Sequence, residues 1–416
     1  MLFIYRLLIN LIIFFSPIII LIRYFKKKED PTRFKEKFCF FSQKKKPGKL
    51  IWFHGASVGE ILSVVPLIEK LEKNKNIKTI LVTSNTLSSS KIIKNLGLKK
   101  TIHQFYPIDS LYLSKKFLNY WTPAIAVFID SEIWPNMILN IKDKNIPLIL
   151  LNARINKNSF KKWFKLSPYI KNIFNKFDLC LSSSKESKFH LKKLGAKNIK
   201  FFGNLKFSQT ENNKEDLNKN LKTFLSKKKV WCAASTHNSE EKIAALAHLK
   251  LKKKNKDLIT IIIPRHIDRI KIIYEELENL NLKVHLFSNK NIPDDETDIF
   301  LIDAYGKTKT FFKVCKIVFL GGSLIKHGGQ NPLGAARYGC KILHGPFIWN
   351  FYEIYTLLSK NNLSNKIDNS NDMFAIIQKN LKKKINNQKI KFKINFIGRK
   401  VLDLTLKEIN YFIIKK

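Results

Sequence analysis

The amino-acid sequence predicts an α/β protein with two consecutive Rossmann-like halves that face each other across a cleft. The first observation is that short apolar runs, rich in Ile, Leu and Val, alternate with helical patterns along most of the chain. This alternation indicates parallel strands that are covered by helices on both faces. The second observation is that the alternation stops in a polar stretch and then restarts. With 416 residues, of which 45% are hydrophobic, the chain can form two buried cores.

The N-terminal segment, residues 1–25, is predicted to be a membrane anchor. Residues 7–22 are apolar except for Asn10, Ser16 and Pro17, and a helix needs about 20 such residues to cross a bilayer. Positive charge is heavier after the segment than before it, which places the body of the protein in the cytoplasm. Pro17 allows a second interpretation, in which the helix is kinked and lies in one leaflet.

The first half is predicted at residues 26–207 and the second at residues 229–416, with an interdomain linker at residues 208–228 that is rich in Lys and Asn. Strands of the first half are expected at residues 50–53, 79–83, 124–129, 148–151 and 179–182, with helices at 61–73 and 135–142. Strands of the second half are expected at residues 230–234, 259–263, 283–287, 299–302, 317–320 and 341–343, with helices at 239–252 and 399–414. In such open sheets, ligands bind beyond the carboxyl ends of the strands.

The charge and the cysteine content of the chain indicate which binding partners are to be expected. A net charge of +44 favours anionic partners: phosphorylated substrates, anionic lipid headgroups or nucleic acid. Because Lys, Asn and Ile are abundant throughout, an AT-rich genome explains most of the excess. The sequence has no helix-turn-helix, zinc-finger or aromatic RNA-binding signature, so we expect no nucleic-acid partner. The five cysteines are scattered without a C-x-x-C pair, which indicates buried thiols rather than a disulfide framework or a zinc site.

The first predicted strand ends in HGASVGE, residues 54–60. Its glycines allow a close approach of the backbone to a ligand, and the following helix offers N–H groups to an anion. Glu60 stands at the start of this helix, where its carboxylate can act as a general base or can simply complement the helix dipole. Residues 55–59 also match the G-x-S-x-G elbow of hydrolases. That fold needs several strands before the elbow, so we interpret this match as coincidental.

Two further polar segments end strands of the first half. DSEIWPN, residues 130–136, brings Asp130 and Glu132 to the sheet edge, where they can position a substrate hydroxyl or cap the next helix. An Asp-x-Glu pair alone is only weak evidence of a metal-binding site. In the segment NAR, residues 152–154, Arg154 is expected to place a positive charge at the same edge. Lys206, near the end of the first half, is expected to point toward the cleft.

The second half has anion-binding candidates at its strand ends. Residues 235–237, STH, end one strand just before a helix, and Arg265 follows another strand as a possible bidentate phosphate donor. Glycine-rich residues 321–323 and 328–333 lead into a helix predicted at 332–338, a geometry that can cradle a nucleotide phosphate.

In their order and spacing, these segments resemble the Kdo (3-deoxy-D-manno-octulosonic acid) transferases of lipopolysaccharide synthesis. The matching segments are residues 54–60, 130–136, 152–154, 203–207, 235–237, 264–266 and 321–331. The resemblance implies a GT-B fold with a membrane-proximal acceptor half and a nucleotide-binding half. It also implies CMP-Kdo as the donor, a lipid A precursor as the acceptor, no metal or other cofactor, and a place on the cytoplasmic face of the inner membrane at its anionic surface.

The resemblance also implies roles for individual residues. Glu60 would be the general base, and Asp130 and Lys206 would stabilise the transition state. The CMP site would be formed by Pro264, Arg265, Gly306, Lys307, Asn331, Pro332, Leu333 and Gly334. This chain departs from the family's usual glutamate at Asp130, Lys307 and Gly334, and from its usual histidine at Gln330.

Three alternatives remain beside this prediction. A glycosyltransferase of the same fold could use another nucleotide sugar. A weak or non-catalytic homologue is suggested by Lys307 and Gly334, because two acids beside the nucleotide are missing. A basic nucleic-acid-binding protein would explain the charge but not the apolar anchor.

Overall fold

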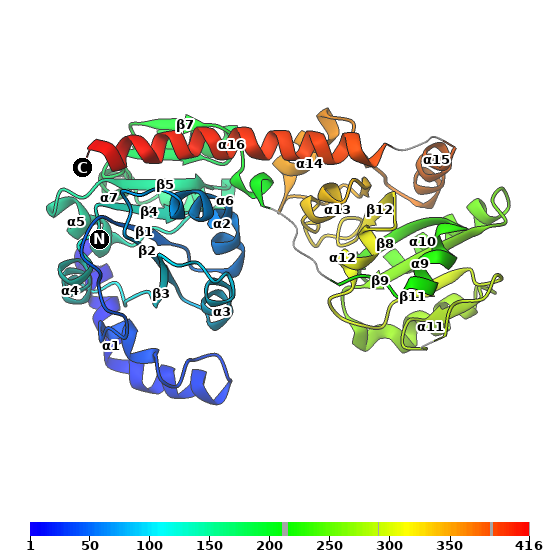
Figure 1. Ribbon diagram of the computed structural model, residues 1–416, viewed down its shortest axis with the longest axis horizontal. Helices are drawn as coiled ribbons and strands as arrows, with labels where there is room; N and C mark the ends of the chain where they lie inside the picture. Colours follow the sequence, from blue (N-terminus) through cyan, green and yellow to red (C-terminus); the bar gives the residue numbers. More distant parts are fainter. Residues whose placement is uncertain (210–214, 290, 383–385, 416) are drawn as a thin grey trace. The chain divides into compact units, whose positions relative to one another are not determined.

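The computed structural model describes residues 1–209, 215–289, 291–382 and 386–415. It contains two seven-stranded parallel sheets, each in its own compact unit (Figure 1). Unit 1 consists of Met1–Gln209 and Ile397–Lys416, and unit 2 consists of Thr210–Phe396. The predicted α/β class, with one doubly wound sheet in each half, is confirmed.

The sheet of unit 1 has the strand order β3-β2-β1-β4-β5-β6-β7. Its strands, in chain order, are β1 Leu50–His54, β2 Thr79–Ser84, β3 Thr101–Phe105, β4 Ile125–Ile129, β5 Leu148–Ala153, β6 Leu179–Ser182 and β7 Ile199–Phe201. Every residue of β1, β2, β4, β5 and β6 is buried, as their apolar sequences predict. The order reverses between β1 and β4, and this switch point is where an open sheet leaves a crevice for ligands.

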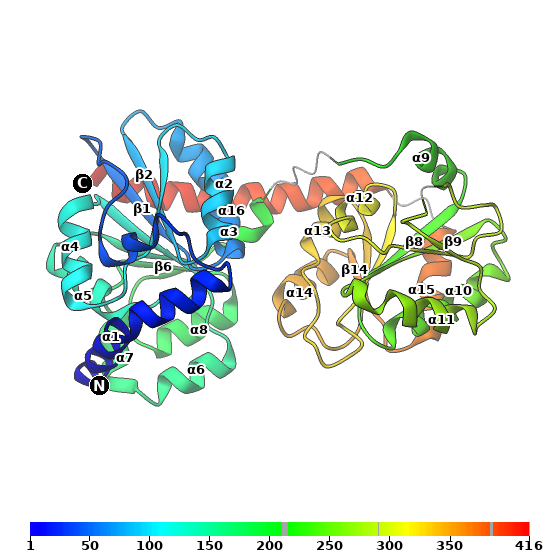
Figure 2. The ribbon, with the colours of Figure 1, turned by 90° about the horizontal axis from the view of Figure 1, so that it is seen from below.

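Helices cover both faces of this sheet (Figures 1 and 2). They are α2 Val58–Glu72, α3 Leu87–Asn95, α4 Leu111–Trp121, α5 Pro135–Asp143, α6 Lys157–Phe164, α7 Ser167–Phe174 and α8 Lys185–Lys193, with the short 3-10 helices η1 Phe34–Phe38 and η2 Leu205–Ser208. Side chains alternate along each strand. Trp52 therefore enters the core on one face of the sheet and its neighbour Phe53 the core on the other.

The last helix, α16 Asn387–Lys415, begins in unit 2 and ends in unit 1. Its side chains Val401, Ile409 and Ile413 are buried in the same core as Phe53. Gly398 permits this close packing, because a Cβ there would lie 2.3 Å from the carbonyl oxygen of Phe207. The chain from Ile397 onward therefore packs with unit 1, whereas the sequence placed all of residues 229–416 in the second half.

The sheet of unit 2 has the strand order β10-β11-β9-β8-β12-β13-β14, which reverses between β8 and β12. Its strands are β8 Lys229–Thr236, β9 Leu258–Pro264, β10 Val284–Leu286, β11 Ile299–Leu301, β12 Ile317–Leu320, β13 Lys341–His344 and β14 Ser364–Lys366. Its helices are α9 Lys219–Ser226, α10 Glu240–Lys252, η3 Ile267–Arg269, α11 Ile270–Glu278, α12 Thr308–Phe312, α13 Leu333–Arg337, α14 Tyr352–Lys360 and α15 Ser370–Leu381. Helix α9 lies within the predicted linker, residues 208–228, of which residues 210–214 are outside the described part of the chain.

The N-terminal segment forms one helix, α1 Leu2–Phe25, with Pro17 inside it. Within the described residues, it is the one helix that is long and apolar enough to cross a membrane, judged by length and composition. In both views it runs alongside unit 1 (Figures 1 and 2).

Candidate active site

Glu60 lies in the first turn of α2, which follows β1 at the switch point of the first sheet. It is the third helical residue of a capping box: Glu60 Oε2 accepts a hydrogen bond from the backbone N–H of Ala56 at 2.7 Å, and Oε1 accepts one from the Ser57 hydroxyl at 2.9 Å. Burial, together with the negative charges of Glu132 and Asp130, raises the pKa of Glu60 to about 7. Glu60 is therefore both a helix cap and a carboxylate that is poised near neutral pH, where a general base is most effective.

Ser57 does not form a hydrolase triad. Its side chain is the N-cap of α2, and its hydroxyl donates to the Glu60 carboxylate. The neighbouring His54 ring is directed elsewhere, toward Thr83 and Glu132. The match of residues 55–59 to a nucleophile elbow is thus explained by helix capping.

Asp130 and Lys206 are brought together at the same edge. Lys206 Nζ lies 3.3 Å from Asp130 Oδ2, and the Asn152 amide donates to Asp130 Oδ1 at 2.6 Å. Asn152 Oδ1 in turn accepts the backbone N–H of Leu205 at 2.9 Å, so the ends of β4 and β5 and the start of η2 are tied into one cluster. Asp130 and Asn152 both have φ of +54°, a conformation that Asp and Asn adopt more readily than other non-glycine residues. Two of the three predicted catalytic residues are therefore in contact.

A second carboxylate, Glu132, completes this edge. His54 Nε2 lies 3.1 Å from Glu132 Oε2, and Trp134 Nε1 donates to the same oxygen at 2.8 Å. Since His54 Nδ1 lies 3.0 Å from the Thr83 hydroxyl, the geometry fits a tautomer whose Nε2–H donates to Glu132. Burial opposes ionisation of Glu132, but the contacts with His54 and Trp134 outweigh it and lower its pKa.

The two glutamates thus have pKa values that are pushed apart by their surroundings. Glu132 is ionised at neutral pH, and its charge makes Glu60 a stronger base. Such divergence between neighbouring carboxyl groups is typical of acid–base sites. Glu132 could be recognised as a candidate from the sequence, but its pairing with His54 could not. The G-x-S-x-G match points to Ser57 instead. The sequence feature that could have indicated the pair is a histidine at the end of one strand and a D-x-E segment after another.

The acids at this edge are already engaged by protein groups: Asp130 by Lys206 and Asn152, and Glu132 by His54 and Trp134. In the part of the chain that the structure describes, there is no group of three or more His, Cys, Asp or Glu side chains arranged to hold a metal ion.

The eight residues predicted to bind CMP lie at the end of β9 or in segments that follow β9, β11 and β12 of unit 2. Pro264 ends β9, and the N–H of Arg265 donates to the Thr236 carbonyl at 2.9 Å, which joins the ends of β8 and β9. The Arg265 side chain is exposed. Gly306 has φ of +82°, and Lys307 forms an ion pair with Glu215 at 3.1 Å.

The other four surround the start of α13. Asn331 Oδ1 accepts the N–H of Leu333 at 3.1 Å, and Pro332 is the N-cap residue of the helix. Gly334 lies in the first turn, where a Cβ would meet only Phe312 at 3.8 Å, an ordinary contact. A Cβ at residue 334 therefore has room.

The structure corrects the expectation of a phosphate cradle at residues 321–323. The N–H groups of Gly322, Ser323 and Leu324 all donate to the carboxylate of Glu240, at 2.7, 3.0 and 2.9 Å. Glu240 is fully buried and begins α10. These amides therefore stabilise the loop from within.

Two Rossmann-like units, with a polar site at the switch point of the first sheet, form the two-domain architecture that glycosyltransferases share with other sugar-nucleotide enzymes. The fold is similar to that of a glycosyltransferase from Rickettsia africae, with a TM-score of 0.56 and 13% identity over 88% of this chain and 99% of that one. Residues 32–209 match the family model described as 3-deoxy-D-manno-octulosonic-acid transferase (kdotransferase).

Curated relatives extend this match to most of the chain. A 3-deoxy-D-manno-octulosonic acid transferase of Rickettsia bellii is 37% identical over 79% of this chain and 78% of its own length. A probable mitochondrial one of Arabidopsis thaliana is 33% identical over 86% of this chain and 83% of its own. The chain therefore belongs to the Kdo transferase family and is a glycosyltransferase.

Proposed function

We propose that this Kdo transferase moves Kdo from CMP-Kdo to a sugar hydroxyl of a lipid A precursor, without a metal ion, at the cytoplasmic face of the inner membrane. The observation that carries the proposal is the carboxylate pair at the switch point of unit 1. Glu60, with a pKa raised to about 7 by burial and by its acidic neighbours, is the general base. The membership in the family supports the sugar that is transferred.

The proposed reaction is a direct displacement at the anomeric carbon of Kdo. The acceptor oxygen forms a bond to this carbon, the bond from the carbon to the phosphate oxygen of CMP breaks, and the hydroxyl proton moves to Glu60. The leaving CMP carries away the electron pair and needs positive groups around its phosphate. Arg265, exposed at the end of β9, can supply a bidentate contact. Lys206, held by Asp130, places a cation beside the reacting centre.

The test is acceptor-dependent release of CMP by the detergent-solubilised protein, with CMP-Kdo and a lipid A precursor supplied. UDP-sugars offered side by side with CMP-Kdo distinguish a glycosyltransferase that uses another donor. An active homologue confirms that donor and lipid are competent. If that homologue releases CMP and this protein does not, the proposal of an active Kdo transferase is wrong.

The non-catalytic alternative is tested at Gly334. We expect Gly334→Glu to fold normally, because a Cβ has room there and glycine costs a helix about 1 kcal/mol relative to better helix formers. We expect it also to lower the Kd for CMP severalfold, because the family's usual carboxylate can accept hydrogen bonds from the nucleotide part of the donor.

The matched control for this variant is Gly334→Ala, which supplies the gain in helix propensity without the carboxylate. The measurements are thermal unfolding and calorimetric titration with CMP. Equal affinity of the two variants for CMP would show that residue 334 does not contact the nucleotide.

A further inference from the structure

Helix α1 is bound to unit 1 along one of its faces. The Tyr5 hydroxyl donates to Asp109 Oδ2 at 2.6 Å, and Arg6 Nε donates to Asn136 Oδ1 at 3.0 Å. Further along the same face, Ile9 is buried and Ile13 packs against the core that contains Trp52. Near the end of the helix, Arg23 pairs at 2.7 Å with Glu29, which lies just after the helix and is itself paired with Lys37. The contact face thus extends over most of the helix.

The opposite face of α1 is apolar and exposed. Its large side chains recur at spacings of three and four residues, and they include Phe3, Leu7, Leu11, Phe14, Ile18 and Ile22. A stripe of this size on a water-exposed surface would be costly, and it fits the acyl region of a bilayer. A helix of 24 residues is about 36 Å long, close to the roughly 30 Å thickness of the hydrocarbon layer. Because side chains from Ile9 to Ile20 face the rest of unit 1 along the length of α1, the geometry fits a helix that lies along one leaflet better than one that crosses the bilayer.

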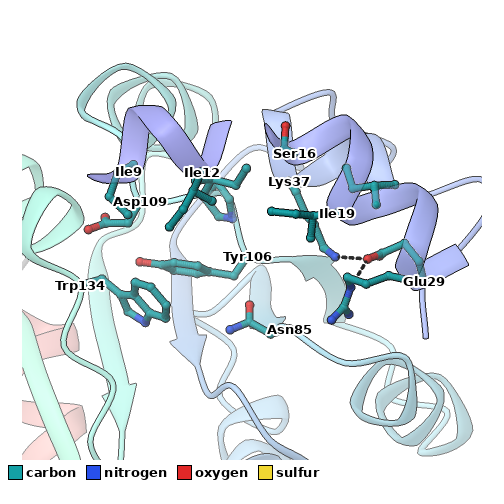
Figure 3. A pocket seen from close by; sticks show the side chains of 14 residues that line it. Ile9, Ile12, Ser16, Ile19, Glu29, Lys37, Asn85, Tyr106, Asp109 and Trp134 are labelled. Carbon is teal, nitrogen blue, oxygen red and sulfur yellow. Dashed lines mark hydrogen bonds and ion pairs between the residues drawn. The ribbon is translucent and has the colours of Figure 1, made fainter. Parts of the chain in front are cut away.

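A groove of about 320 Å³ lies between α1 and the rest of unit 1 (Figure 3). The roof of the groove is formed by Ile9, Ile12, Ile19 and Ile20 of α1. The floor comes from segments that follow the carboxyl ends of β2, β3 and β4, and includes Asn85, Tyr106 and Trp134. This volume is at the lower end of the range for ligand sites, about 300–1,000 Å³.

The floor of the groove is the reverse side of the candidate active site. The ring of Tyr106 stacks on His54 with 3.7 Å between centroids. Trp134 hydrogen-bonds to Glu132 at 2.8 Å. A molecule in the groove therefore lies one side-chain layer away from the carboxylates at the switch point.

Most polar groups in the groove are engaged by other protein groups; the exception is the buried Tyr106 hydroxyl, which has no hydrogen-bond partner among the described residues. Glu29 pairs with Arg23 and with Lys37, at 2.7 and 2.5 Å, and Asp109 accepts hydrogen bonds from Tyr5 and from the start of α5. What remains open is mainly apolar side chains. The groove is therefore suited to an aliphatic chain and poorly suited to a sugar.

We propose that this groove binds an acyl chain of the lipid acceptor, which enters sideways from the leaflet along which α1 lies. The inference rests on the proposed function, because it assigns a subsite to the acceptor of that reaction. The position of the groove supports it: the roof belongs to the helix whose outer face meets lipid, and the floor supports the His54–Glu132 pair. The headgroup of the same lipid would then reach the edge that holds Glu60.

The test uses a matched pair of variants on α1. Ile12 and Leu11 are neighbours with similar exposed fractions, 45% and 47%, but Ile12 lines the groove and Leu11 faces away. We expect Ile12→Trp, which fills the groove, to raise KM for the acylated acceptor about tenfold. We expect Leu11→Trp to behave like the wild type. With a deacylated, water-soluble form of the acceptor, all three proteins should have the same KM. Equal effects of the two substitutions, or no effect of Ile12→Trp, would overturn the proposal.

A binding measurement separates this subsite from the proposed reaction. An acceptor whose acyl chain carries bromine should quench the fluorescence of Trp134, and this fraction of the quenching should be missing in Trp134→Phe. Vesicles of brominated phosphatidylglycerol serve as the comparison. If they quench Trp134 equally well, the groove holds bulk lipid and the assignment to the acceptor is wrong. Quenching by the brominated acceptor without any release of CMP would instead retain the subsite and refute the reaction.

Discussion

Replacing Glu60 with glutamine is expected to lower kcat for acceptor-dependent CMP release by about a thousandfold, within the usual range for loss of a general base. Glutamine is a good probe because it can take the same place in a capping box. Its side-chain oxygen can still accept the N–H of Ala56, which the Glu60 carboxylate accepts at 2.7 Å. The thermal stability of Glu60→Gln should therefore remain close to that of the wild type, so that lost activity reports lost proton transfer.

The pH dependence of the wild type gives the same prediction a second readout. A base works in its deprotonated form, so kcat should fall as the pH drops below about 7, the pKa to which burial and the neighbouring acids raise Glu60. Glu132→Gln removes one of those negative charges and should move the profile to lower pH. A wild-type profile that stays flat through neutrality, or a Glu60→Gln variant of nearly full activity, would rule out Glu60 as the base.

The strands at the centre of each sheet could be predicted from sequence because they are buried on both faces. Ile125–Ile129 and Ile317–Leu320 are continuous apolar runs of this kind. Three strands were missed: Thr101–Phe105, Ile199–Phe201 and Ser364–Lys366. All three lie at the edges of their sheets, where one side has no neighbouring strand and short or polar sequences suffice.

The first site was predictable because its residues follow strands directly. In a parallel sheet, strand ends converge at one edge, so Asp130 and Lys206 could be expected to meet, and they do. What could not be read from the sequence depends on contacts between distant segments. The pairing of His54 with Glu132 and the docking of Tyr5 on Asp109 are of this kind. The same holds for the last helix, whose Val401 and Ile409 complete the core of the first unit.

The glycine-rich loop shows how a local motif can mislead. Residues 321–323 have the composition of a phosphate cradle, but a buried carboxylate from α10, 81 to 83 residues earlier in the chain, already occupies the position of the anion. The sequence gives no sign of this, because Glu240 stands in the first turn of a helix, where glutamate is common and usually exposed. The loop amides of Gly322 and Ser323 thus have a structural partner.

Removing the carboxylate of Glu240 is expected to be the most destabilising single change in unit 2. Its two oxygens accept four backbone N–H groups, from His237 at 2.9 Å and from Gly322, Ser323 and Leu324 at 2.7 to 3.0 Å. Glu240→Ala leaves four donors without an acceptor. Each unsatisfied buried group costs about 1–3 kcal/mol, so we expect a loss of at least about 4 kcal/mol, a large part of the roughly 5–15 kcal/mol that stabilises a typical domain.

The neighbouring residue Glu241 provides the matched control. Glu241 is also buried and is held mainly by one partner, Arg269, at 3.0 Å. Hydrogen–deuterium exchange of the solubilised full chain, read separately for peptides of each unit, measures the effect and keeps unit 1 as an internal reference. In Glu240→Ala, peptides that contain residues 321–324 should exchange much faster than in Glu241→Ala. Equal exchange in the two variants would mean that the loop does not depend on the buried carboxylate.

The charge of Glu240 also gives this prediction a direction in pH. Burial opposes its ionisation, but the contact with His237 and the loop amides outweigh it and lower its pKa below the ordinary value for glutamate. A carboxyl group with a lowered pKa stabilises the folded state above its unfolded pKa, and that contribution is lost as the pH falls. Protection of residues 321–324 should therefore decline in acid in the wild type, and much less in Glu240→Gln. Because the same loop precedes Asn331 and Gly334 in the chain, the variant should also bind CMP more weakly, which links the buried carboxylate to the donor segment that it supports.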